Sequence, residues 1–156
     1  MTLSERLQND LTQAIRDRDE LRRDALRMAI SAANLAAKTA RRPITDDELI
    51  GLLGREIRTR RETIESFAAA GRAEVAATEQ AKLEIISAYM PEQLGEDELA
   101  ALVVQAVDES GAMSARDMGK VMAALMPKVR GRADGKAVSG LVARELARRD
   151  LAGHAH

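Results

Sequence analysis

Apolar residues recur every three or four positions along most of this chain, a period that predicts amphipathic α-helices. Thr2 with Glu5, and Thr45 with Glu48, fit the capping box that opens a helix. Before the second box, Pro43 disfavours helical geometry at Arg42, the residue that precedes it, so a helix should end there. The first half of the chain therefore predicts four helices: one through Ile15, one from about Glu20 to Arg42, one from Thr45 to near Gly71, and one over about 72–89.

The stretch YMPEQLGEDEL (89–99) breaks this pattern with a proline, a glycine and clustered acids, which is typical of a linker. Three further helices are expected after it: about Glu96 to Glu109, Ser114 to Pro127, and a last one capped by Asp134. We predict an all-α fold with an N-terminal helical domain of about four helices (1–91), a three-helix C-terminal domain (92–150) and a disordered tail, LAGHAH (151–156).

The composition supports helix-on-helix packing and excludes several classes of functional site. Hydrophobic residues make up 46% of the chain, and Phe67 and Tyr89 are its two aromatic residues. Because the chain has no cysteine, it has no disulfide framework, thiolate nucleophile or cysteine-based zinc site. The two histidines, His154 and His156, lie in the expected tail, where we predict neither a metal site nor a catalytic base. No cofactor is predicted.

The N-terminal segment carries charges where a signal peptide needs an apolar core. The longest uncharged run near it, residues 28–37, is too short to cross a bilayer. We therefore expect a cytoplasmic protein with no membrane partner.

No arrangement of side chains indicates an active site. The Gly119-Lys120 pair lacks the upstream glycine of a phosphate-binding loop, and Val121 stands where that loop needs a hydroxyl. Acids alternate with bases in segments such as TRRETIE (59–65), as expected for ion pairs along a helix. We predict no catalytic residue, although the sequence leaves the question of enzymatic activity open.

Charge is divided unevenly within a net charge of −1. Residues 74–109 hold nine acids and one base, whereas residues 116–149 hold nine bases and three acids. This asymmetry indicates two surfaces with different partners, or one half of the chain docking on the other; ordinary solvated helix faces would give the same pattern.

The basic half contains a turn, MPKVRGRADGK (126–136), in which four cations surround two glycines. In an extended turn, the two arginines beside Gly131 would point the same way, and the glycine would admit another backbone. Guanidinium and ammonium groups of this kind suit phosphate contacts. The candidate nucleic-acid-binding residues are Lys128, Arg130, Gly131, Arg132 and Lys136, with Lys120, Arg144 and Arg148 in support. The alternative is a solubilising loop, paired with the acids of 92–98.

The run DMGKVMAALMPKVRGRADGKAVSGLVARELA (117–147) closely resembles the C-terminal unit of YqeY-like proteins. A related unit forms the tail of the B subunit of glutamine-dependent tRNA amidotransferases. The stretches EQAKLEIISAYMPEQL (79–94) and LSERLQNDLTQAIRDRDELRRDALRM (3–28) are similar to the same family. The sequence departs from the family at Ser139, where many relatives carry Asn, at Gly95, where a Ser cap is common, and in its tail.

The resemblance implies a helical protein in which the C-terminal unit contacts the body of a tRNA. The family is often classed with carbon–nitrogen ligases that use glutamine as amido donor, but the catalytic parts of the amidotransferase have no counterpart here. The resemblance thus favours an accessory protein that binds tRNA or another structured RNA. The alternatives are a protein-interaction adaptor, with an amidotransferase or another enzyme as partner, and an enzyme with glutaminase activity. The sequence does not reveal the oligomeric state.

Overall fold

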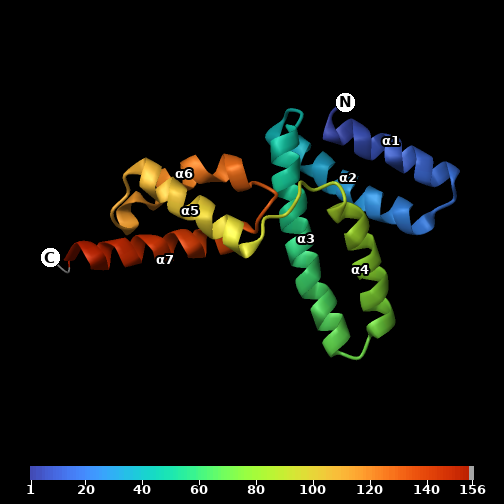
Figure 1. The fold of residues 1–156 in the computed structure, drawn as a ribbon. Helices are drawn as coiled ribbons and strands as arrows, with labels where there is room; N and C mark the ends of the chain where they lie inside the picture. The colour runs from blue at the N-terminus through green and yellow to red at the C-terminus, as the bar shows by residue number, and fades with distance from the viewer. Residues whose placement is uncertain (155–156) are drawn as a thin grey trace. The chain divides into compact units, whose positions relative to one another are not determined.

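The computed structural model describes residues 1–154, which form seven α-helices, one 3-10 turn and no strand (Figure 1). The prediction of an all-α fold is confirmed. Residue contacts divide the chain into two compact units, Met1–Pro91 and a second that begins at Glu92. Within the described residues, no helix is both long enough and apolar enough to cross a membrane.

The first unit consists of two helical hairpins. Both capping boxes are present: the Thr2 hydroxyl accepts from the Glu5 amide at 3.1 Å, and the Thr45 hydroxyl accepts from the Glu48 amide at 3.2 Å. The α3–α4 turn contains Gly71 at φ +79°, a left-handed conformation that glycine adopts without strain. The helices are α1 (Leu3–Arg16), α2 (Glu20–Ala40), α3 (Asp46–Ala69) and α4 (Ala73–Ser87).

The core of this unit is built largely from leucines and alanines, and the alanines allow α1, α2 and α4 to approach closely. Tyr89 closes one end. Its hydroxyl donates to the Asp10 carboxylate, and the Arg6 guanidinium lies 4.7 Å from the ring centre. Burial, together with the bond to Asp10, raises the pKa of Tyr89 to about 12. The fully buried leucines are Leu7, Leu26, Leu49, Leu53 and Leu83.

The second unit packs three helices around a valine-rich core. The α5 helix ends at Ser110, close to the predicted end near Glu109, and Gly111 follows it with a left-handed φ of +69°. A 3-10 turn, η1, then leads into α6. The elements are α5 (Glu96–Ser110), η1 (Ala115–Asp117), α6 (Met118–Val129) and α7 (Gly135–His154). The fully buried side chains are Val107, Val121, Leu125, Val129, Val138, Val142 and Leu146.

Two helix ends differ from the sequence-based prediction. We expected α6 to end at Pro127, but it continues to Val129, which is completely buried, and the Arg130 amide bonds to the Met126 carbonyl at 2.9 Å. Proline removes one hydrogen bond here, whereas burial of Val129 favours another half turn. We also expected a disordered tail over 151–156, but α7 continues to His154, because no proline or early glycine stops it. The rest of that tail lies outside the described residues.

Candidate nucleic-acid interface

The cationic turn between α6 and α7 is a tight turn rather than an extended one. Arg130 has φ −55° and ψ 122°, Gly131 has φ +73°, and the Arg132 amide bonds back to the Val129 carbonyl at 2.8 Å. These values match a type II β-turn, which requires a positive φ at its third residue. Gly131 is therefore needed for the backbone conformation, and the candidate residues on either side of it are held by a defined turn.

This turn is fastened to the segment Glu92–Leu94 by hydrogen bonds to neutral groups. The Leu94 amide donates to the Arg132 carbonyl at 2.8 Å, and the Gln93 side-chain amide donates to the Gly131 carbonyl at 2.7 Å. In return, Arg132 Nε donates to the Glu92 carbonyl at 3.0 Å. The two stretches of sequence that carry the family resemblance, PEQL and VRGRAD, are thus in direct contact. Arg132 belongs to the scaffold of the turn, and its neutral partner leaves the guanidinium charge uncompensated.

The remaining cations of the turn are presented to solvent to different degrees. Arg130 is exposed. Lys128 Nζ lies 3.8 Å from the Glu109 carboxylate, yet its side chain keeps 46% exposure, so this ion pair is weak and screened. Lys136 is exposed in the first turn of α7, and within residues 1–154 it forms no ion pair with a carboxylate.

Of the three supporting cations, Arg144 and Lys120 are exposed, whereas Arg148 forms an ion pair with Glu145. Lys120 lies near Asp117, whose pKa is lowered mainly by the hydrogen bond from the Met113 amide and also by the Lys120 charge. Arg144 forms no ion pair within the described part of the chain. The structure therefore brings Lys136 and Arg144 onto α7 as cations that have no acidic partner among the residues it describes.

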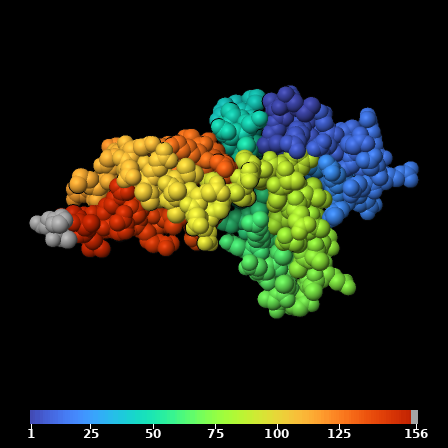
Figure 2. All heavy atoms as spheres, in the orientation of Figure 1, coloured from blue at the N-terminus to red at the C-terminus, as the bar shows by residue number. Residues whose placement is uncertain are grey.

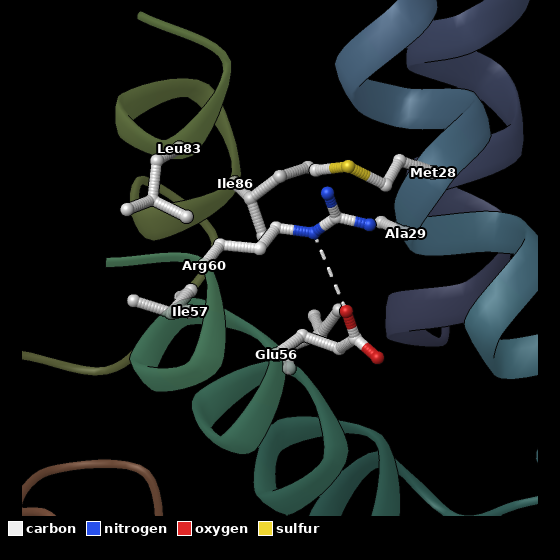
Figure 3. Close-up of a pocket in the computed structure, with 8 residues that line it drawn as sticks. Met28, Ala29, Glu56, Ile57, Arg60, Leu83 and Ile86 are labelled. Atoms are coloured by element: carbon white, nitrogen blue, oxygen red, sulfur yellow. Dashed lines mark ion pairs between the residues drawn. The ribbon is translucent and has the colours of Figure 1, made fainter. Parts of the chain in front are cut away.

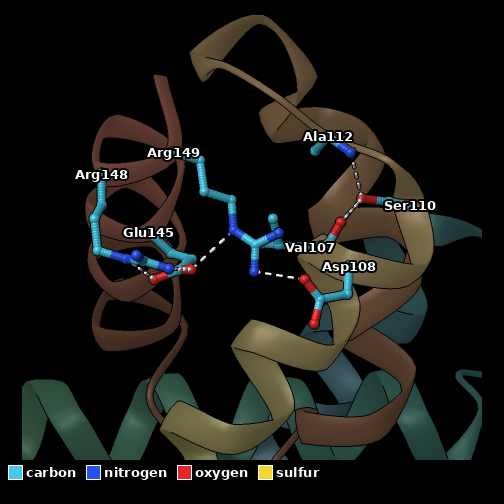
Figure 4. A network of polar contacts seen from close by, with 7 residues as sticks. All are labelled: Val107, Asp108, Ser110, Ala112, Glu145, Arg148 and Arg149. Atoms are coloured by element: carbon cyan, nitrogen blue, oxygen red, sulfur yellow. Dashed lines mark hydrogen bonds and ion pairs between the residues drawn. The ribbon is translucent and has the colours of Figure 1, made fainter. Parts of the chain in front are cut away.

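Glu145 compensates positive charge in the second half of α7 (Figure 4). It accepts from Arg148 at 2.6 Å and from Arg149 at 2.9 Å, and Arg149 also reaches Asp108 of α5 at 2.6 Å. The hydrogen bonds from Arg148 and then Arg149 lower the pKa of Glu145 to about 2. Arg148, one of the predicted supporting contacts, thus offers less charge to a ligand than Arg144 does.

The first unit contains a small pocket between α2, α3 and α4 (Figure 3). The Arg60 side chain lies across it, with Nε 3.4 Å from the Glu56 carboxylate and without a hydrogen-bond partner. The space is about 10 Å³, room for about one water molecule. Among the described residues, no group of acids and histidines has the arrangement of a metal site.

The sequence suggested the acids of 92–98 as possible partners of the turn, and the turn does contact the start of that segment, through the Glu92 carbonyl and the Gln93 side-chain amide. Gln93 and Glu92 stand 38 and 40 residues before the groups that they bind, so nothing local in the sequence links them. The sequence placed the PEQL stretch in the predicted linker and in the family resemblance, but it did not single out Gln93 as a partner of Gly131.

Two comparisons with known proteins show the family of this chain. The family model of Yqey-like proteins matches residues 4–146, which covers both units. The chain is also 34% identical over 132 residues to "Altered inheritance of mitochondria protein 41, mitochondrial" of the fungus Pyrenophora tritici-repentis, and the match covers 82% of this chain and 71% of the fungal protein.

Proposed function

This chain belongs to the Yqey-like protein family, and on that premise we propose that it is an accessory protein whose second unit binds structured RNA, with tRNA as the first ligand to test. One observation carries the proposal: Lys136 and Arg144 are exposed on one helix and lack an acidic partner within the described residues. Unpaired cations in a region with nine bases and three acids favour a polyanionic ligand.

The contacts would go to phosphates rather than to bases. Phe67 and Tyr89, the aromatic residues on which a base could stack, both belong to the first unit, and Tyr89 is buried there. The second unit contains no phenylalanine, tyrosine or tryptophan, and its candidate contact residues are cations together with Gly131 of the rigid turn. Recognition of this type depends on the shape and backbone of a folded RNA rather than on its sequence.

The turn and α7 have different roles in this proposal. Arg130 and Lys128 extend the cationic surface beyond Lys136, while Arg132 holds the turn against Glu92. The resemblance to the tail of the tRNA amidotransferase B subunit supports tRNA as ligand, and no group of side chains in the structure supports amide transfer by the chain alone. We propose a cytoplasmic location for this chain; the mitochondrial location in the name of the fungal relative is a statement about that protein.

Copurification tests the proposal against the adaptor alternative. The tagged protein is isolated from lysate, with and without nuclease, alongside a Lys136→Ala/Arg144→Ala variant and a charge-matched Arg27→Ala/Arg55→Ala control in the first unit. We expect tRNA to copurify with the wild type and the control but not with the Lys136→Ala/Arg144→Ala variant. A protein partner that survives nuclease, with no bound RNA, would favour the adaptor instead.

A further inference from the structure

The outer face of α7 is a cationic strip without an acid. Helical periodicity places Lys136, Gly140, Arg144 and Arg148 along one ridge at i, i+4 spacing, and all four are exposed. Alanines fill the neighbouring exposed positions. Figure 2 shows α7 (red) at the surface along most of its length. The two acids of this helix, Glu145 and Asp150, are not members of this ridge and are half-buried, although Glu145 accepts hydrogen bonds from Arg148.

The charge of the strip is greatest in its first half. Arg148 donates to Glu145, which compensates it, whereas Lys136 and Arg144 are uncompensated within residues 1–154. These two cations stand two helical turns apart, about 12 Å along the axis. The positive end of the helix dipole lies beside Lys136 and adds to the same field.

Gly140 lies midway between these two cations, and the packing of the protein does not explain it. Apart from proline, glycine is the least favourable residue for a helix interior. A Cβ atom added at Gly140 would meet nothing within 4 Å, so no neighbouring segment of the protein requires the small residue. The absence of a side chain at Gly140 affects the exposed surface of the helix. Another molecule can contact the helix backbone there, while the cations one turn before and one turn after Gly140 contact the same molecule.

We propose that this strip is where the sugar–phosphate backbone of double-helical RNA lies along α7, in contact with Gly140 and held by Lys136 and Arg144. The inference rests on the proposed function and specifies its ligand as a duplex. A 20-residue helix presents a rigid row of charge along one ridge, which suits a rigid duplex. The absence of an aromatic residue in the strip argues against a single strand, because such strands are usually held by stacking.

The test uses substitutions that change no charge. Gly140→Leu blocks close approach, Gly140→Ala tests a smaller obstruction, and Ala101→Leu on exposed α5 is the matched control. Each full-length variant is titrated with a tRNA transcript, a blunt RNA duplex and its single strand, and its thermal unfolding is recorded. We expect Gly140→Leu to bind the tRNA and the duplex about tenfold more weakly while Ala101→Leu matches wild type. Gly140→Ala should raise the melting temperature by a few degrees, about what a better helix former gives.

The outcomes separate this inference from the function on which it rests. If wild type binds none of the RNAs, the proposed function is wrong and the inference falls with it. If wild type binds tRNA and Gly140→Leu binds equally well, RNA binding stands but the strip is not its site. A single strand that binds as tightly as the duplex would overturn the choice of ligand. Gly140→Leu could weaken binding by destabilising the fold, which a lower melting temperature would show. Gly140→Ala separates this effect from a lost contact, because it is expected to be more stable than wild type and still to bind more weakly.

Discussion

Glu145 is the residue whose ionisation matters most for the second unit. Its side chain is only 13% exposed and holds Arg148 and Arg149 in place. Because its pKa falls from 4.5 to about 2 on folding, the carboxylate stabilises the folded state above about pH 5, and this contribution is lost as the pH falls toward 2.

We therefore predict that the free energy of unfolding decreases by about 1–2 kcal/mol between pH 5 and pH 2 because of this group, a value reduced by the solvent exposure of Arg148. Urea unfolding at several pH values measures it. Glu145→Gln should show a smaller slope over that range, and a variant with the wild-type slope would contradict the assignment.

Arg132 has a structural role in addition to its charge, because its Nε holds the turn against the Glu92 carbonyl. Arg132→Ala removes the hydrogen bond to the Glu92 carbonyl and should lower the free energy of unfolding by about 1 kcal/mol. Arg144→Ala, at an exposed position without an ion pair, is the control and should change stability by less than about 0.5 kcal/mol. Denaturant unfolding compares the two, and equal stability of both variants would show that the Arg132 bond is not structural.

At the scale of elements, the helix starts could be predicted from sequence because capping is local. Thr2 and Thr45 need only a glutamate three residues later, and both boxes formed. The end of α7 was placed too early, although no proline in the tail stops the helix. The end of α6 could not be predicted, because it depends on the burial of Val129 by other segments. The same limit applies to the candidate site: its cations were visible in the sequence, but the fastening of Gly131 to Gln93 required the fold.

The extension of α6 past Pro127 depends on the burial of Val129. Val129→Ala should lower the free energy of unfolding by about 2 kcal/mol, because the side chain is fully enclosed and its loss leaves a cavity. Met113→Ala, at a site 73% exposed, should have little effect in the same thermal and denaturant experiments. A loss below about 0.5 kcal/mol for Val129→Ala would mean that another contact extends the helix.

At the scale of the whole molecule, acids and bases are separated along the chain, and the basic part is concentrated around one turn and one helix. The net charge is −1, so general attraction to nucleic acid is not expected from the total. The RNA binding that we propose comes from local groups, above all Lys136 and Arg144, and is therefore expected to be sensitive to salt and to a small number of substitutions.

The salt dependence of tRNA affinity measures these contacts most directly. With about four phosphate contacts, the plot of log affinity against log salt concentration should have a slope of roughly −3 for the wild type. For Lys136→Ala/Arg144→Ala, the slope should become less steep by about 1.5, because two contacts are lost. An unchanged slope in this variant, or no measurable affinity of the wild type at low salt, would contradict the proposal that these cations bind RNA.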